Sequence, residues 1–450
     1  MATGKFVSTG VPIEAAVERV LLGDFQGNGR SSVLGLGSTN SVGTSYARLF
    51  FFENDGSSLE STILGTPVTS PLLGDLSGDG RDDLIFSLIY GVGVLIGQET
   101  QELLPVSYPL KTLQPGATTL AVPIRPHPAA VLNEDMTILV AFENNGVLEN
   151  LSDGNIIAKL PHPHEQLAGD PVVADVIKND SAPCGELLLT YRGDSEVWMV
   201  IPCTAQGKWS EPSSSLQIAA RLPSGQSTAS KAFVDDLDGD GQLDLIVESA
   251  TATYVGLGCG DGQFCGDKKD LTTAGEMILF AFRPPANCSS NVGTKHEPIL
   301  AIGDLNSDGQ PDVITQSDIL IVSDVDIQSG TVYVCPAASK LVGTWTTAQI
   351  ADLNQDGRAD VIAGSSNDLD LDFYAGTGLD RLNHSRITTS APVSKLSIGD
   401  FDGDQISDIA VALSTSGGGV QAHRDLLAIS YGQIQKSPEA LVSVAAFDQI

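Results

Sequence analysis

Short apolar runs alternate along this chain with acidic, glycine-containing loops. Ala301-Ile302 precedes one such loop and Val313-Ile314 follows it, while another loop lies between the apolar runs 396–398 and 409–411. Apolar runs of this length, bounded by Gly, Asp and Asn, are typical of β-strands joined by tight turns. The pattern therefore predicts an all-β chain in which strand, acidic loop and strand recur.

A nine-residue phrase fills these loops and repeats its carboxylates at the same positions. Clear copies are DLDGDGQLD from Asp236, DLNSDGQPD from Asp304, DLNQDGRAD from Asp352 and DFDGDQISD from Asp400. A more altered copy, DLSGDGRDD, begins at Asp75, and DFQGNGRSS from Asp24 keeps a single carboxylate. Lone Asp-Gly pairs are ordinary turn formers, but turn formation alone does not require the same carboxylates in every copy.

The phrases recur at a nearly constant interval. Those at residues 304, 352 and 400 are 48 residues apart, and the first two, at 24 and 75, are 51 apart. The interval between 75 and 236 has room for two further units, over residues 118–142 and 170–191, with Asp175 at the first position of the second. The chain therefore contains eight similar units, each long enough for four short strands.

Repeats of about 40–50 residues, each a small β-meander, indicate a β-propeller. We expect one domain over residues 1–450 with four-stranded blades, eight blades being favoured over seven, and an open solenoid as the alternative. Residues 1–20 could supply a strand that closes the ring. Residues 436–450 either pack at that closure or begin a further repeat.

The spacing of the phrase matches the ligands that calcium prefers. Calcium takes six to eight oxygen ligands, which a short loop can supply from alternate residues and one backbone carbonyl. Positions 1, 3, 5 and 9 would offer side chains, position 7 its carbonyl, and the glycine at position 6 permits a sharp turn. The loop of helix–loop–helix proteins instead closes with Glu at position 12, where this chain has Val247. We therefore predict about four to five calcium ions.

The candidate ligands follow from these positions. In the clear copies they are Asp236, Asp238, Asp240, Gln242 and Asp244; Asp304, Asn306, Asp308, Gln310 and Asp312; Asp352, Asn354, Asp356, Arg358 and Asp360; and Asp400, Asp402, Asp404, Ile406 and Asp408. The altered copy offers Asp75, Ser77, Asp79, Arg81 and Asp83. We assign no site to the copy at Asp24 or to the units at Thr118 and Asp175.

The phrases GDLNSDGQPDVI, ADLNQDGRADVIAG and GDFDGDQISDIAVA resemble the FG-GAP or VCBS repeat family, which includes the propeller of integrin α subunits and secreted propeller lectins. This resemblance implies calcium between the first two strands of a blade and a secreted or cell-surface location. It does not imply one function, because such proteins serve in adhesion, glycan binding, enzyme accessory roles and toxin scaffolds.

Composition narrows the possible partners. The net charge is −32 and no basic run interrupts it, which argues against nucleic acid, whose binding needs basic patches. A membrane-spanning helix needs about 20 consecutive apolar residues, and no apolar segment of this chain approaches that length, so we expect no membrane insertion.

The six cysteines favour an oxidising compartment, the alternative being buried thiols. A hairpin that turns at Gly193-Asp194 would pair residues whose numbers sum to 387, which brings Cys184 opposite Cys203. Cys259 and Cys265 bracket a glycine-rich loop that a disulfide could close. Cys288 and Cys335 remain, and could pair with each other.

Function is less constrained than fold. Arg192-Gly193-Asp194 spells an adhesive tripeptide on the expected hairpin turn, although a Gly-Asp turn beside a strand-end Arg is the favoured interpretation. The sequence shows no nucleophile paired with a base, so we expect no enzyme. The leading hypothesis is recognition of a glycan or a cell-surface protein, with calcium in a structural role. The sequence does not determine the oligomeric state. The alternatives are a non-catalytic module of a larger surface protein or toxin and, third, a polysaccharide-acting enzyme, which a central Arg, Tyr and His pocket would favour.

Overall fold

The computed structural model describes only part of the 450-residue chain. The described residues are 9–13, 16–29, 32–38, 45–52, 59–64, 69–74, 79–88, 91–99, 104–107, 118–123, 138–143, 147–150, 156–159, 172–177, 185–201, 215–226, 228–249, 251–260, 262–265, 277–285, 288, 297–326, 330–339, 344–378, 382–389, 391–399, 407–413 and 425–430. Every regular element among them is a β-strand, which confirms the predicted all-β class.

Consecutive strands form antiparallel meanders. In the first half of the chain the sheets are β2 (Ala16–Gly23), β3 (Ser32–Ser38), β4 (Ser45–Phe52) and β5 (Leu59–Leu64); β6 (Thr69–Gly74), β7 (Asp83–Leu88), β8 (Gly91–Ile96) and β9 (Leu104–Ser107); β10 (Thr118–Pro123), β11 (Ile138–Glu143), β12 (Val147–Asn150) and β13 (Ile156–Lys159); and β14 (Val172–Ala174), β15 (Glu186–Thr190), β16 (Glu196–Val200) and β17 (Leu216–Arg221).

In the second half, two meanders share one nine-stranded sheet. They are β18 (Thr228–Asp235), β19 (Asp244–Ser249), β20 (Thr253–Gly258) and β22 (Ile278–Arg283), followed by β23 (Ile299–Gly303), β24 (Asp312–Thr315), β25 (Asp318–Asp326) and β26 (Thr331–Ser339). A parallel pair, β22 with β26, joins them, and the short β21 (Phe264–Cys265) pairs with β20. The next sheet comprises β27 (Thr347–Ala351), β28 (Asp360–Gly364), β29 (Asp370–Ala375) and β30 (Asn383–Thr388).

The last sheet combines the two ends of the described chain. It comprises β31 (Val393–Gly399), β32 (Asp408–Leu413), β33 (Asp425–Ser430) and β1 (Thr9–Ile13). Strand β1 pairs antiparallel with β33, from Thr9 opposite Ile429 to Ile13 opposite Asp425. The strand expected within residues 1–20 therefore completes a sheet begun by the C-terminal region, whereas residues 436–450 lie outside the described part.

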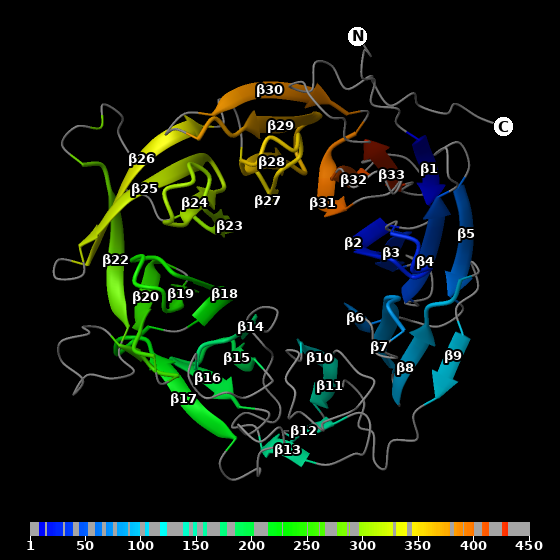
Figure 1. Ribbon diagram of the computed structural model, residues 1–450, viewed down its shortest axis with the longest axis horizontal. Coiled ribbons are helices and arrows are strands. Elements are labelled where there is room, and N and C mark those ends of the chain that lie inside the picture. The colour runs from blue at the N-terminus through cyan, green and yellow to red at the C-terminus, as the bar shows by residue number, and fades with distance from the viewer. Residues whose placement is uncertain are drawn as a thin grey trace.

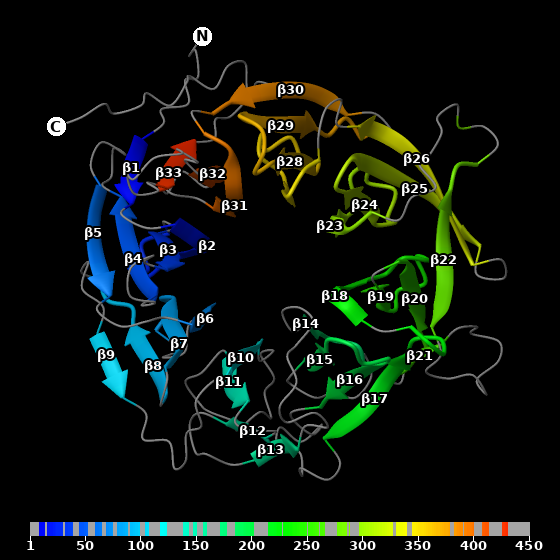
Figure 2. The same ribbon diagram turned by 180° about the vertical axis from the view of Figure 1, so that it is seen from behind.

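The meanders stand side by side around a common centre, as Figures 1 and 2 show from opposite sides. The first strand of each meander lies nearest the centre and the fourth lies at the rim. Buried apolar clusters lie between successive meanders rather than in one central core. Leu188 of β15 clusters with Leu245 and Val247 of β19, and Ile321 of β25 clusters with Val361 of β28. Packing of neighbouring sheets face to face thus holds the ring together.

Candidate metal centre in the acidic loops

Each acidic phrase connects the first strand of a meander to the second. Its ninth residue begins the second strand and pairs with the residue that precedes the phrase, as in Asp235 with Asp244 and Gly303 with Asp312. The same pairing occurs at Asp83 and Asp360. The loop is therefore short and tied at both ends to hydrogen-bonded strands, which limits the positions that its side chains can reach.

The first Asp of the phrase organises the turn. Its carboxylate accepts hydrogen bonds from the backbone N–H groups of positions 5 and 6: Asp240 (3.0 Å) and Gly241 (2.7 Å) donate to Asp236. The same two bonds form at Asp304, from Asp308 (3.2 Å) and Gly309 (3.0 Å). They form again at Asp352, where the distances are 3.1 and 2.9 Å. The phrase is thus a repeated structural unit as well as a repeated sequence.

The turn requires left-handed backbone at two positions. Gly241 has a φ of 85° at position 6, where glycine pays no steric penalty. At position 4 the two non-glycine residues of the described chain with positive φ are Ser307 (62°) and Gln355 (54°). A left-handed L-residue costs about 1–2 kcal/mol, so the loops hold strained backbone that their hydrogen bonds offset.

The ninth Asp is buried and holds the loop to the third strand. Asp312 accepts the N–H of Leu305 at position 2 (2.8 Å) and that of Val322 in β25 (2.8 Å). Asp360 makes the equivalent bonds to Leu353 (3.0 Å) and Gly376 (2.8 Å). Sequence reasoning assigned this residue only to closing the metal shell, and missed that it also bonds backbone groups on both sides.

Asp244 shows the same arrangement, with bonds from Leu237 (2.8 Å) and Gly258 (2.7 Å). In the altered copy, Asp83 accepts the N–H of Gly97 at 2.8 Å. The ninth-position carboxylates of these four loops have 0% exposure, which matters because a buried charge is stable only when it is bonded or paired.

A glycine at the end of the third strand, or directly after it, allows this close approach. A Cβ added at Gly376 would lie 2.3 Å from the carbonyl oxygen of Ala359, and one at Gly258 would lie 2.4 Å from that of Leu243. Gly97 repeats the pattern, with the carbonyl oxygen of Asp82 at 2.6 Å. The recurring glycine of VLIG, GLG and FYAG is the sequence signal that could have identified these positions.

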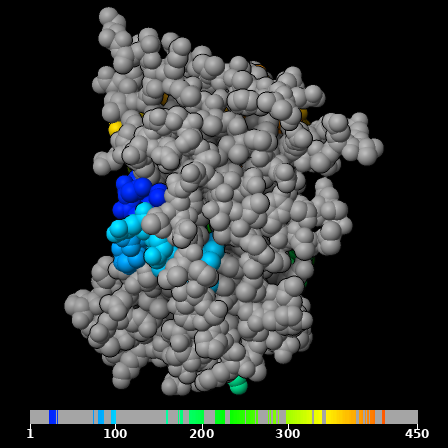
Figure 3. Space-filling view, turned by 90° about the vertical axis from the view of Figure 1, so that its right-hand side faces the viewer, coloured from blue at the N-terminus to red at the C-terminus, as the bar shows by residue number. Residues whose placement is uncertain are grey.

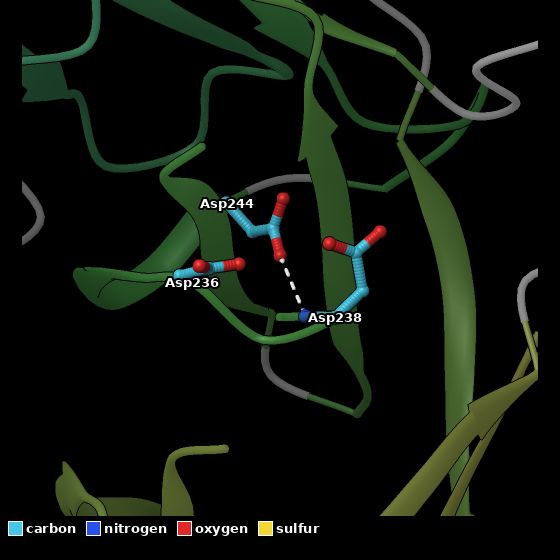
Figure 4. Close-up of side chains that lie close together, drawn as sticks. All are labelled: Asp236, Asp238 and Asp244. Atoms are coloured by element: carbon cyan, nitrogen blue, oxygen red, sulfur yellow. Dashed lines mark hydrogen bonds between the residues drawn. The ribbon is translucent and has the colours of Figure 1, made fainter. Parts of the chain in front are cut away.

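The carboxylates of one loop converge to the spacing that a cation needs. Asp236, Asp238 and Asp244 each offer an oxygen atom, and these atoms lie within 4.8 Å of one another (Figure 4). The backbone N–H of Asp238 also donates to Asp244 at 3.3 Å, the dashed line of the figure. Three hard carboxylate oxygens at this spacing fit calcium, whose ligands are oxygen atoms at about 2.3–2.6 Å.

Burial makes two of the ninth-position carboxylates, Asp312 and Asp360, hard to ionise without a counter-charge. Burial raises the pKa of Asp312 to about 7, and Asp308 and Asp304 add to the rise while the backbone bonds oppose it. Burial likewise raises the pKa of Asp360 to about 6. A bound divalent cation would remove this penalty, because opposite charge favours the ionised form.

The loop at Asp24 keeps the turn without the ligands. Asn28 (3.1 Å) and Gly29 (2.8 Å) donate their N–H groups to Asp24, as in the acidic loops. Asp24 in turn donates its N–H to the carboxylate of Asp82 in the next unit at 2.8 Å. Figure 3 shows the blue segment near residue 25 beside the cyan residues of that unit. This loop is therefore a structural turn joined to its neighbour.

The unit at Asp175 uses a longer side chain in the ninth-position role. Glu186 begins β15 opposite Ala174 and accepts the N–H groups of Val176 (2.7 Å) and Ile177 (3.1 Å). Glu186 therefore replaces the ninth-position Asp in holding the backbone, although the intervening loop is longer than nine residues.

Several predicted sites fall outside the described residues. Among the candidate ligands these are Asp75, Ser77, Asp400, Asp402, Asp404 and Ile406, and of Asp408 only the backbone, in β32, is described. Cys184 and Cys203 also lie outside, but β15 and β16 pair with Leu187 opposite Val200, which confirms the predicted hairpin register. Cys259 is disulfide-bonded, while Cys288 and Cys335 are thiols.

The tripeptide lies on the predicted turn but its Asp faces the hairpin. Arg192 and Gly193 are exposed, and the N–H of Asp194 donates to the carbonyl of Tyr191 (3.1 Å). The Asp194 carboxylate accepts bonds from the indole of Trp198 (3.1 Å) and the N–H of Glu196 (3.2 Å). This carboxylate thus has a structural role in the turn.

A second cluster, which the sequence did not reveal, lies on β29 and β30 at the rim (Figure 1). Asp372 is buried and accepts bonds from Trp345 Nε1 (2.8 Å) and Arg386 Nε (3.3 Å), and its Oδ1 lies 3.0 Å from His384 Nε2. The His384 ring stacks on Tyr374 with centroids 4.6 Å apart. These rim residues include Arg, Tyr and His, but they lie on the outer strands and not at the centre of the ring.

Comparison with known proteins leaves the family open. No family model matches the chain, and no curated protein sequence matches it significantly. The described part contains no helix long and apolar enough to cross a membrane. The resemblance of the acidic phrases to a repeat family therefore remains a prediction.

Some solved structures resemble the chain weakly. One is an Agrocybe aegerita lectin that recognises non-reducing terminal N-acetylglucosamine, with 16% identity over 85% of this chain and 90% of the lectin, and a TM-score of 0.45. Another is dihydro-heme d1 dehydrogenase NirN, with 12% identity over 83% of this chain and 74% of that chain, and a TM-score of 0.45. A third is the Photorhabdus luminescens Tc holotoxin pore, with 14% identity over 88% of this chain and 17% of that one, and a TM-score of 0.31.

Proposed function

We propose that this chain is an eight-bladed β-propeller whose blades are stabilised by calcium. Six four-stranded sheets and one sheet that contains two meanders support a count of eight. The pairing of β1 with β33 supports a closed ring, because it joins the first described strand to the last.

The observation that carries the calcium proposal is the repeated geometry of the acidic loops. Loops that share no backbone segment place the first Asp, the turn and the buried ninth Asp in the same bonding pattern. About four to five ions would bind, at the positions that the phrase provides. Each ion would offset carboxylate repulsion, and its binding energy would add to the stability of the folded state.

The role of this propeller, in our proposal, is recognition of a glycan or a cell-surface protein outside the cell, without catalysis. The rim residues around Asp372 support it, because His384 and Arg386 have side chains 38% and 44% exposed beside buried aromatic rings. An exposed imidazole and an exposed guanidinium, both held in place by a buried carboxylate, can bond hydroxyl or carboxylate groups with little loss of side-chain entropy.

A glycan array tests this proposal when it is probed with the calcium-loaded and the metal-free protein. Calcium-dependent binding to a related set of sugars, weakened in His384→Ala and Arg386→Ala but retained in Arg221→Ala, is the expected result. Arg221 is a suitable control because it is also exposed and lies elsewhere, paired with Glu196. A blank array from a folded, calcium-loaded sample would overturn glycan recognition and favour a protein partner or a purely structural module.

A further inference from the structure

The residue at position 7 divides the four acidic loops in which it is described into two kinds. Two loops carry glutamine there, Gln242 and Gln310, and two carry arginine, Arg81 and Arg358. In all four, the backbone N–H of this residue donates to the carboxylate at position 5, over 2.8 to 3.0 Å. These four loops therefore share one backbone geometry around position 5, and the position-7 side chain is one of the positions at which they differ.

Arg81 extends back over its own loop and pairs with a predicted calcium ligand. Its Nη1 lies 2.7 Å from Oδ2 of Asp79, the carboxylate at position 5. Its Nη2 lies 2.9 Å from Glu99, and its Nε donates to the carbonyl of Gln26 at 3.4 Å. With an exposure of 21%, this side chain is held by groups on three segments. Its guanidinium is a cation located at a carboxylate that calcium would bind.

Arg358 repeats the arrangement less tightly. Its Nη1 lies 3.5 Å from Oδ2 of Asp356, again the position-5 carboxylate, and its side chain is 46% exposed. Its Nε is 3.0 Å from the point where a Cβ on Gly378 would lie, which shows that the side chain rests on the loop after the third strand. Arg358 should therefore be easier to displace than Arg81.

In the Asp304 loop, neutral groups rather than a guanidinium bond the position-5 carboxylate. At Asp308, Oδ2 accepts a bond from the neutral amide of Asn306 at 2.9 Å, and Oδ1 accepts the N–H of Gln310. A neutral amide can rotate and present its oxygen to a metal ion, whereas a guanidinium has no acceptor to offer. The side-chain oxygens of Gln242 and Gln310 are buried with no hydrogen-bond partner, so these residues do not neutralise the loop.

We propose that Arg81 and Arg358 are built-in competitors of calcium, so that the loops bind the ion with two different affinities. This inference rests on the proposed calcium loops. To bind, an ion must take the position-5 carboxylate from the guanidinium and then remain close to a like charge. An exposed ion pair is weak, so the expected penalty is about fivefold at Arg358. It should be larger at Arg81, whose guanidinium is less exposed and also pairs with Glu99. The loop at Asp304 would fill before those at Asp75 and Asp352 as calcium rises.

Isothermal titration of the metal-free full-length chain with calcium chloride tests the inference. Arg358→Gln should tighten one of the weaker sites about fivefold, and Arg358→Lys should leave it weak because the charge stays. Gln310→Arg should weaken one of the tight sites by a similar factor. Arg221→Gln makes the same change in net charge away from the loops and should alter no site.

The inference would be overturned if all calcium sites of the wild-type chain had the same affinity and neither Arg358→Gln nor Gln310→Arg changed it. Calcium binding would persist in that outcome, and the proposed function would stand. If the wild-type chain takes up no calcium, the proposed function itself fails. A second readout, the calcium concentration that gives half of the rise in melting temperature, should shift in the same direction as each affinity and does not depend on heat of binding.

Discussion

Replacing Gly376 with alanine tests whether the close approach between loop and third strand determines stability. The new Cβ would lie 2.3 Å from the carbonyl oxygen of Ala359, about 1 Å closer than a van der Waals contact allows. The clash involves backbone, so no side-chain rotation relieves it. The strand must move away, which stretches the 2.8 Å bond between the N–H of Gly376 and the buried Asp360 beyond hydrogen-bonding range.

The magnitude follows from these two effects. Overpacking a tight site costs about 1–3 kcal/mol, and losing a bond to a buried carboxylate costs about 1.5–3 kcal/mol. The unfolding entropy per residue, about 2.1 cal/mol/K, makes each kcal/mol worth roughly 1 °C in a cooperative chain of 450 residues. Gly376→Ala should therefore lower the melting temperature by about 2–6 °C.

Thermal unfolding followed by circular dichroism measures this shift, in calcium and after its removal. The decrease should be larger in calcium, because displacement of residues 358–360 would also weaken the metal site. Ser366→Ala, an exposed change in the turn between β28 and β29, serves as the control. A Gly376→Ala protein that melts within 1 °C of wild type in both conditions would refute the reasoning, since the distance could not then be as short as described.

Three further predictions concern other parts of the chain. Burial raises the pKa of Asp312 to about 7 in the folded, metal-free protein, above its unfolded value of 3.8. The contribution of Asp312 to the free energy of unfolding is therefore full below about pH 4 and is lost as the pH rises through 7. Metal-free protein should accordingly melt higher at pH 5 than at pH 7.5, and calcium should abolish that trend. Asp194→Ala removes the acceptor of the Trp198 indole, so it should change Trp198 fluorescence and leave cell attachment intact. Loss of cell attachment when Asp194 is replaced by Ala or by Glu would contradict a purely structural role for Asp194. Trp345→Phe removes the indole donor from buried Asp372 and should lower the melting temperature by about 2–4 °C, an effect that unchanged thermal melts would disprove.

The sequence predicted those parts of the fold that depend on local pattern. The alternation of apolar runs and acidic phrases located β23, the loop at Asp304 and β24, because strand periodicity and turn chemistry act within a few residues. The register of β15 on β16 followed from the position of the Gly193 turn alone.

The contacts that join distant segments were not predictable in this way. Nothing near Asp360 indicates that its carboxylate bonds the N–H of Gly376, since that contact depends on how the third strand returns past the loop. The rim residues show the same limit: Trp345, Asp372 and His384 come from separate segments, and only their packing brings them together. The pairing of β22 with β26 was also unexpected, because meanders of one repeat type predict no bond between neighbouring rims.

The pairing of β1 with β33 has a consequence for the order of folding. The first described strand has no partner until the last has been synthesised, so this sheet cannot form progressively from the N-terminus as the others can. Contacts between such distant segments carry the greatest loop-closure entropy and form slowly. We expect the inner meanders to assemble first and the ring to close last. Until then the free edge of β33 would be exposed, and strand β1 of a second chain could pair with it and produce a domain-swapped dimer.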